Sequence, residues 1–301
     1  MKNKQTKRSP MFYVGDKYKL IDEIKRYFPE NIDTFIEPFV GGGTVSLNIQ
    51  ANKYILNDID KNVYQLHKFL NKKSNEENFL LEILKYVKKY NLSRSFSEDI
   101  VPTKLRQKYK KTYYAKYNKD GYNKLKQDFN KAKRKDLMSL YVLLIYGFNR
   151  MLRFNSKGEF NVPVGNVDFN QNVKKAIKGY FDFVKEKEVK LDNLDFSPFI
   201  KKNGFKENDF IYLDPPYLIT FSEYNKIWNE EKEIELLALL DTLHTKNIKF
   251  AISNVTTYKE RKNHIFINWM KKYKNTKIQS NYISYHDNSN KDFEEVLVFN
   301  Y

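Results

Sequence analysis

The stretch that decides the fold is Asp209-Phe210-Ile211-Tyr212-Leu213-Asp214-Pro215-Pro216-Tyr217. Its apolar residues 210–213 predict a short buried strand. Two prolines stop this strand, because neither can donate a hydrogen bond to a neighbouring strand and Pro216 disfavours helical geometry at the residue before it. We therefore expect Asp214 and Tyr217 in an extended turn at the carboxyl end of the strand, which is the edge of an open α/β sheet where ligands bind.

The turn Asp214-Pro215-Pro216-Tyr217 suits a planar ligand that carries an exocyclic amine. The Asp214 carboxylate and the Pro215 carbonyl can accept the two N–H bonds of the amine, and the ring of Tyr217 can stack on the ligand. The same residues also occur in an ordinary loop after an ordinary strand. A short motif is a hypothesis until its surroundings support it, so the rest of the chain has to decide.

Residues 34–60 predict a second strand-and-loop unit with the features of a nucleoside site. Residues 34–40 form an apolar strand, Gly41-Gly42-Gly43 a turn, and residues 45–51 a predicted helix, before a second strand at 54–57 that ends in Asp58. Glycines allow a ligand to approach the backbone, and an acid at the tip of the next strand is where α/β folds bind a ribose hydroxyl. The pattern is neither G-x-G-x-x-G nor a P-loop, so pyrophosphate is not the predicted ligand. A dehydrogenase remains an alternative on this unit alone.

The remaining elements alternate in type. The predicted helices cover residues 19–28, 63–69, 76–90, 122–132, 136–146, 169–184, 231–245 and 258–273, and the further predicted strands cover 189–194, 249–254 and 295–299. This alternation predicts an α/β fold with a mostly parallel sheet and helices on both faces. Long polar helices between residues 61 and 165 interrupt it.

The charge of the chain points to a polyanionic partner. The 301 residues include 54 Lys and Arg against 37 Asp and Glu, which gives a net charge of +17 and a pI near 9.5. Residues 101–160 hold 16 basic and only 4 acidic side chains. Tyrosines are interspersed among them at Tyr109, Tyr113, Tyr114, Tyr117 and Tyr122. A solvated lysine-rich helix face is the usual meaning of such a run. Phosphate binding is the alternative, because basic side chains release condensed counterions and phenols hydrogen-bond phosphate oxygens.

Residues 147–165 predict a β-hairpin inside this basic region. Asn155-Ser156-Lys157-Gly158 has the composition of a turn, and its glycine can supply a positive φ. Phe148, Asn149 and Arg153 flank the turn, and Arg and Asn are side chains that read base edges in a DNA groove. The alternative is a packing hairpin with solvated polar residues.

Several classes of protein are excluded by what the sequence lacks. There are no cysteines, which excludes disulfides and thiolate nucleophiles, including those used in cytosine-C5 methylation. No apolar run approaches the ~18 residues of a membrane span, and residues 1–8 are basic and polar rather than a secretory signal. The histidines lack ligand-like spacing, so no metal site is predicted and each is expected on the surface or in the core. They are His67, His244, His264 and His286. A cytoplasmic, nucleoid-associated location fits these features.

The motifs taken together, in this order along the chain, resemble the Dam-type (D12 class) DNA adenine-N6 methyltransferases. The matching segments are 39–43, 57–58, 148–149, 153–155, 158–163 and 214–217, which together span nearly the whole chain. The resemblance implies a Rossmann-like class I sheet that binds S-adenosylmethionine, with helices on both faces and a mostly helical target-recognition insert that carries a β-hairpin. It places the catalytic and cofactor-binding domain at residues 1–60 and 166–301 and the insert at 61–165.

The resemblance also implies roles for individual residues. The residues matching the family's cofactor site are Tyr13, Lys17, Glu37, Phe39, Gly41, Gly43, Asp58 and Asp214. Those matching its catalytic site, which holds the target adenine, are Asp214, Pro215, Pro216 and Tyr217. Those matching its DNA-binding hairpin are Phe148, Asn149, Met151, Arg153, Asn155 and Pro163.

Three departures from the family pattern concern the amino-terminal segment. The family more often has Trp where this chain has Tyr13, and a glycine pair where it has Gly15-Asp16. Phe12 stands where some relatives place a base-contacting lysine, which leaves the first base pair of the site without that reader. The expected target is therefore GATC or a related short site.

The activity that the resemblance implies is methyl transfer from S-adenosylmethionine to N6 of an adenine flipped out of double-stranded DNA. Expected features are a monomer, double-stranded DNA as partner, no membrane association and a restriction endonuclease as functional partner. Cytosine-N4 methylation is an alternative, although Ser is typical there at the position of Asp214. A methylase of RNA or of a protein glutamine stays open, although Asn would be expected at that position for the glutamine enzyme. A DNA-binding protein with an inactive cofactor site stays open as well.

Overall fold

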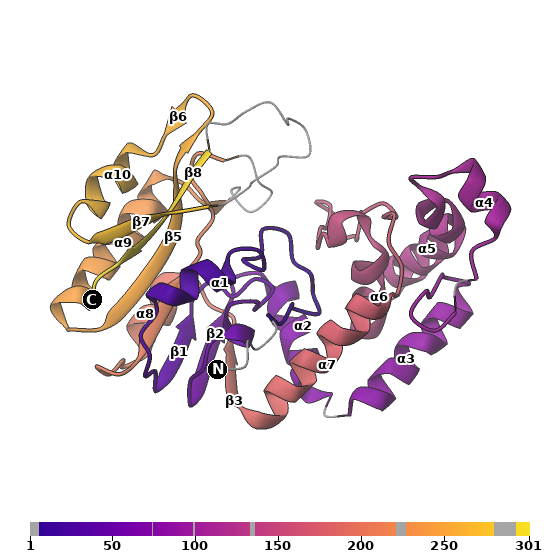
Figure 1. Ribbon diagram of the computed structural model, residues 1–301, viewed down its shortest axis with the longest axis horizontal. Coiled ribbons are helices and arrows are strands. Elements are labelled where there is room, and N and C mark those ends of the chain that lie inside the picture. The colour runs from indigo at the N-terminus through magenta and orange to yellow at the C-terminus, as the bar shows by residue number, and fades with distance from the viewer. Residues whose placement is uncertain (1–5, 74, 99, 133–135, 221–226, 280–292) are drawn as a thin grey trace.

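An eight-stranded sheet forms one lobe of the computed structural model, and a group of helices forms a second lobe beside it (Figure 1). The structure describes residues 6–73, 75–98, 100–132, 136–220, 227–279 and 293–301. The strands are β1 Thr34–Glu37, β2 Lys53–Asn57, β3 Glu188–Asp192, β4 Phe210–Leu213, β5 Lys249–Tyr258, β6 Arg261–Lys262, β7 Lys274–Ile278 and β8 Phe293–Phe299.

The strand order is β3-β2-β1-β4-β5-β8-β7, with β6 paired to β5. Strands β1 to β5 pair in parallel, β8 is antiparallel to β5, and β7 is antiparallel to β8. The chain builds outward from β1 through β2 to β3 and then returns to place β4 on the other side of β1. The point between β1 and β4 is thus a topological switch point, and the loops at the carboxyl ends of these two strands border one crevice.

The predicted α/β class is confirmed. The position of β4 in the sheet explains why its sequence is continuously apolar. Phe210 and Tyr212 belong to the core on one face of the sheet, and Ile211 and Leu213 belong to the core on the other. Successive side chains of a strand point to opposite faces, so a strand covered by helices on both sides needs apolar residues at every position.

The helices are α1 Ile21–Ile24, α2 Lys61–Lys72, α3 Glu76–Lys89, α4 Thr103–Lys108, α5 Tyr113–Lys131, α6 Leu137–Tyr146, α7 Gln171–Glu186, α8 Phe196–Lys202, α9 Glu230–Thr245 and α10 His264–Met270. Short 3-10 helices are η1 Lys25–Tyr27, η2 Ser46–Asn48 and η3 Phe148–Arg150. Helices α8, α9 and α10 share a core with one face of the sheet, and α1, α2 and α7 share a core with the other. In the described part of the chain, none of these helices is both long and apolar enough to cross a bilayer.

Helices α3 to α6 form the second lobe, which lies within the connection from β2 to β3 (Figure 1). Nine residues of α6 are buried, from Met138 to Tyr146, so this helix is the centre of the lobe. Gly121 lets α5 lie against the end of α3, because a Cβ there would stand 1.8 Å from the carbonyl oxygen of Tyr90. Helix α2 packs between the lobes and contacts β3. The division into a catalytic domain and a recognition insert at residue 61 remains a proposal.

Two predicted helices are wrong in extent. Residues 45–51 form only the turn η2, because the Asn48 side chain bonds the Thr44 carbonyl at 2.8 Å and so takes the acceptor that an α-helix would use. Residues 258–273 begin instead as the end of β5 and the short strand β6, joined by a turn with Lys259 at φ 57°. Helix α10 begins only after Asn263, whose side chain accepts the backbone N–H of Phe266.

Other boundaries differ because short elements carry weak periodicity. Helix α5 begins nine residues before the predicted start at residue 122, and α4, α8 and β7 are present but not predicted. The predicted helix over 19–28 is one short turn of α1 followed by η1.

Candidate active site

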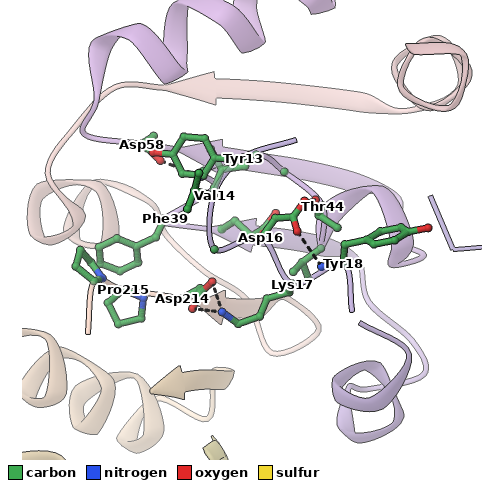
Figure 2. Close-up of a pocket in the computed structure, with 18 of the residues that line it drawn as sticks. Tyr13, Val14, Asp16, Lys17, Tyr18, Phe39, Thr44, Asp58, Asp214 and Pro215 are labelled. Carbon is green, nitrogen blue, oxygen red and sulfur yellow. Dashed lines mark hydrogen bonds and ion pairs between the residues drawn. The ribbon is translucent and has the colours of Figure 1, made fainter. Parts of the chain in front are cut away.

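A cavity of about 800 Å³ lies at the switch point of the sheet. It is lined by the segment before α1, the loops after β1 and β2, and the turn after β4 (Figure 2). This volume is in the range of small-molecule and cofactor sites. All predicted cofactor and catalytic residues line it, namely Tyr13, Lys17, Glu37, Phe39, Gly41, Gly43, Asp58, Asp214, Pro215, Pro216 and Tyr217. The recess of the glycine loop and the recess of the Asp-Pro-Pro-Tyr turn are thus parts of one space.

The glycine loop turns sharply and lies close to its neighbours. Gly41 and Gly43 adopt φ angles of 47° and 73°, a region that glycine enters without steric cost. A Cβ on Gly42 would stand 2.8 Å from the Cβ of Tyr13. The three glycines are therefore needed for the fold of the loop, and the ring of Tyr13 covers part of it.

His67, on α2, forms a hydrogen bond with the glycine loop. Its Nε2 lies 2.8 Å from the carbonyl oxygen of Gly41, and the side chain is only 1% exposed. Burial lowers the pKa of the imidazole, so the ring is neutral and its Nε2 carries the proton that Gly41 accepts. His67 is thus the core residue that was predicted, and His244 and His264 are exposed as predicted, whereas His286 lies outside the described residues.

Asp58, directly after β2, also forms a hydrogen bond with the glycine loop. One carboxylate oxygen accepts the backbone N–H of Gly41 at 2.9 Å, and the other accepts that of Asp60 at 2.9 Å. Burial raises the pKa of this carboxyl to about 6 despite these two hydrogen bonds. Each oxygen keeps a second lone pair for a ligand hydroxyl.

Glu37 is a deeply buried carboxyl of the cavity. It ends β1, is 3% exposed, and accepts the backbone N–H of Ser46 at 3.2 Å. Burial raises its pKa to about 8, with the negative charge of Asp214 as a further cause. A buried carboxyl of this kind favours a cation beside it, because a positive ligand would offset the desolvation of the charged form.

Asp214 forms a buried ion pair with Lys17. The Lys17 ammonium donates to both carboxylate oxygens at 2.7 and 2.6 Å (Figure 2). It also donates to the hydroxyl of Tyr217 at 2.8 Å. It also lies 3.5 Å from Glu295, on β8. Burial opposes the charge on Lys17, but the carboxylates of Asp214 and Glu295 outweigh it, and the pKa of Lys17 is raised. The amine is thus a fixed cation between two carboxylates.

The Tyr217 hydroxyl completes this cluster. It lies 2.8 Å from Asp214 Oδ1 and 3.0 Å from Glu295 Oε1, either of which can accept its proton. Burial and the two carboxylates raise the pKa of the phenol, so it remains a donor. The sequence led us to expect a stacking ring at this position; the structure adds that the hydroxyl anchors the ring to the acceptor of the site.

The cavity is acidic although the chain is basic. Six carboxyl side chains line it against three basic ones, Arg8, Lys17 and Lys19. The six are Asp16, Glu37, Asp58, Asp60, Asp214 and Glu295. A chain with a net charge of +17 therefore presents a cation-attracting recess within a surface that attracts polyanions.

Sequence reasoning missed several residues that line this cavity: Arg8, Asp16, Thr44, Ile59, Ile227 and Glu295. Ile59 follows Asp58 directly and is 46% exposed, and Ile227 is 59% exposed. An exposed isoleucine next to a strand-end acid is a signal that could have been used, because an apolar ligand group would cover it. Glu295 carried no local signal, since it lies inside an apolar strand far along the chain.

The six predicted DNA-binding residues lie outside this lining, on the segment that follows α6. The segment forms a loose hairpin: the N–H of Phe148 donates to the Pro163 carbonyl at 2.8 Å, and Phe154 and Phe160 form an isolated bridge. Arg153 donates to the Asn161 side chain at 2.9 Å and is half-buried, and Met151 is half-buried as well. The predicted hairpin is present, and its role in DNA binding stays a prediction.

Asn155 and Phe12 have structural tasks in this arrangement. The Asn155 side chain accepts the N–H groups of Lys157 and Glu159 at 3.0 and 2.9 Å, so it shapes the turn at the hairpin tip. Phe12 is 4% exposed, so its ring offers no surface to a base. It packs against the guanidinium of Arg150 instead.

Comparisons with known proteins agree with the site. The family model described as D12 class N6 adenine-specific DNA methyltransferase matches residues 13–289. The type II methyltransferase M.FokI of Planomicrobium okeanokoites is 35% identical over 98% of this chain, and the modification methylase StsI of Streptococcus sanguinis is 30% identical over 98%. The match covers 43% of each of these two relatives, so the chain spans less than half their length. The DNA adenine methylase of Escherichia coli K12 is 29% identical over 83% of this chain and 81% of its own length.

Proposed function

Because the chain belongs to the D12 class of N6 adenine-specific DNA methyltransferases, we propose that it transfers a methyl group from S-adenosylmethionine to N6 of an adenine in double-stranded DNA. The observation that carries the proposal is the single cavity in which the carboxyl-lined recess of the glycine loop meets the acceptors Asp214 and Pro215. A methyl donor and a planar amine can contact each other there, because no part of the protein separates the two recesses.

The residues present fit the cofactor. S-adenosylmethionine is cationic at its sulfonium and amino groups. The buried carboxyl of Glu37 and the half-buried carboxyl of Asp16 line the recess that would hold its methionine end. Asp58 keeps acceptors for the ribose hydroxyls. Ile59 and Ile227 supply exposed apolar surface for the purine ring. When bound, the cofactor supplies the electrophilic methyl group.

Asp214 and the Pro215 carbonyl would accept the two N6–H bonds of the target adenine. The N6 lone pair is delocalised into the ring and is a poor nucleophile, and these acceptors stabilise the positive charge that develops on the nitrogen as it attacks. The Lys17 ammonium does not cancel this effect, because Lys17, Asp214 and Glu295 together carry a net charge of −1. Lys17 fixes the carboxylate in position. Oδ1 of Asp214 already accepts from Lys17 and Tyr217, whereas Oδ2 accepts from Lys17 and retains a lone pair for the amine.

The adenine has to leave the duplex to reach this cavity, which costs a few kcal/mol. The basic second lobe, with its hairpin, is suited to hold the DNA while this happens, and Arg153 is the residue we propose as a base reader. GATC or a related short site, a monomeric protein, a restriction endonuclease as functional partner and a cytoplasmic location remain parts of the proposal. They are supported by the resemblance of the hairpin and the names of the relatives alone.

Two rival functions have less support. Cytosine-N4 methylation is disfavoured by Asp214, and a protein without activity is disfavoured because every predicted cofactor and catalytic residue lines the same cavity. The test is incubation of the protein with labelled S-adenosylmethionine and duplex DNA, followed by nucleoside analysis. Label in N6-methyladenine supports the proposal; label in N4-methylcytosine, or DNA binding without transfer, refutes it. Asp182→Ala, on the surface of α7, is a control that should retain activity.

A further inference from the structure

An arginine from each lobe packs on one phenylalanine ring. The guanidinium carbon of Arg150, at the end of η3, lies 3.7 Å from the ring centroid of Phe12, and that of Arg8 lies 4.8 Å from the same centroid. The ring is 4% exposed. This group, the Arg8–Phe12–Arg150 cluster, joins the segment before α1 to the start of the hairpin.

The backbone of the cluster is strained on both sides of the contact. Phe12 adopts φ 49°, and the consecutive residues Asn149 and Arg150 adopt 50° and 51°. The left-handed region is unfavourable for residues other than glycine, and such strain persists only where the surroundings hold it. The position of the Arg150 guanidinium is therefore fixed by the fold rather than left to a flexible surface side chain.

The negative charge around the two guanidinium groups is weak, because Asp168 raises the pKa of Arg150 by less than Arg8 lowers it. Arg8 forms a long ion pair with Asp16, with 4.0 Å between Nε and the carboxylate. The Nε of Arg150 is buried and has no hydrogen-bond partner among the described residues. Burial and then the charge of Arg8 lower the pKa of Arg150 to about 10. A buried donor without a partner and two neighbouring cations both favour an anion at this place.

We propose that Arg8 and Arg150 together bind one backbone phosphate of the DNA, next to the nucleotide that enters the cavity. The cluster stands in the right place for this, because Arg8 lines the cavity and Arg150 follows the hairpin residues Phe148 and Asn149. A phosphate relieves the repulsion between two cations, which the neutral edge of a guanine does not. The proposal rests on the proposed function and adds to it a site that anchors the strand between the lobes.

The test is the salt dependence of DNA binding by the full chain. Affinity for a duplex that contains the target site is measured between about 50 and 200 mM salt for the wild type, Arg150→Gln, Arg8→Gln and the double variant. Arg26→Gln removes an exposed arginine on η1 and is the matched control. Each phosphate contact that a variant loses lowers the magnitude of the slope of log K against log salt concentration by about 0.9.

We expect Arg150→Gln to weaken binding by about tenfold, equally on duplexes with matched and altered sites. The double variant should lower the slope by about 1 in total, because a single phosphate is shared, and Arg26→Gln should leave slope and affinity unchanged. An unchanged slope in the double variant, a change of about 2, or a loss confined to one base pair would overturn the proposal. Since Arg8→Gln leaves the strained hairpin backbone untouched, it also separates phosphate binding from misfolding.

Methylation by the wild type is measured on the same duplexes. Binding without transfer counts against the proposed function, whereas the slopes decide on the phosphate site by themselves. The two proposals can therefore fail separately.

Discussion

Replacing Asp214 by alanine should reduce stability as well as abolish methyl transfer, because it leaves a buried ammonium behind. Lys17 is 5% exposed and lies 2.6 Å from Asp214 and 3.5 Å from Glu295. At an effective dielectric constant of about 20, these distances correspond to attractions of about 6 and about 5 kcal/mol. Glu295 thus retains nearly half of the attraction that holds the Lys17 charge.

The loss of stability expected for Asp214→Ala follows from the share of the attraction that Glu295 retains. Complete loss of the partner of a buried charge costs about 3–5 kcal/mol. Because Glu295 remains and water can reach the 22% exposed position 214, we expect about 2 kcal/mol for Asp214→Ala. Lys17→Met removes the cation instead and leaves Asp214 and Glu295 facing each other, so it should also destabilise the protein.

Urea denaturation of the wild type, both single variants and the double variant measures the interaction as a thermodynamic cycle. We expect the double variant to be more stable than the sum of the single effects predicts, by at least 1 kcal/mol. DNA binding by Asp214→Ala should stay close to that of the wild type, while transfer is lost. If Asp214→Ala were as stable as the wild type and the two changes additive within about 0.5 kcal/mol, the buried pair would not exist in solution.

Three further predictions concern other parts of the molecule. Burial raises the pKa of Glu37 to about 8, so the native state holds a proton that the unfolded state releases above about pH 4.5. The free energy of unfolding should therefore fall as pH rises from 4.5 to 8, by up to about 1.4 kcal/mol per pH unit. Glu37→Gln should remove this slope in denaturation curves at several pH values, and an unaltered slope would contradict the assignment. Gly42→Ala should weaken cofactor binding in calorimetry, since its Cβ would collide with Tyr13, whereas Gly204→Ala, which has open space, serves as control. Arg153→Ala should lose about 1–3 kcal/mol of discrimination at one base pair, and an equal loss on all sequences would make it a phosphate contact.

The sequence predicted the local units of the site well. The strand at 210–213 and the glycine loop between 41 and 43 are present where they were expected, and the strand predicted over 34–40 is present over 34–37. These units depend on neighbouring residues only: prolines end a strand wherever it lies, and glycine permits a positive φ in any surroundings. The helix predicted at 45–51 was wrong because the Asn48 side chain takes a backbone acceptor that the helix would use. The helix predicted at 258–273 was too long because its first residues pair in β5 and β6, and Asn263 caps α10 only from residue 264.

What the sequence by itself determined was therefore the set of residues that line the cavity, which we propose as cofactor and catalytic residues, and the α/β alternation that brings them to one edge of a sheet. The tertiary structure alone decided their partners: Lys17 meets Asp214 across 197 positions of the chain, Glu295 joins them from the strand β8, and Arg150 reaches Phe12 from the other lobe. No local pattern encodes such contacts, because they depend on the order of strands in the sheet and on how the second lobe packs against it. Electrostatic partners are set by distance in space, and only the complete fold fixes that distance.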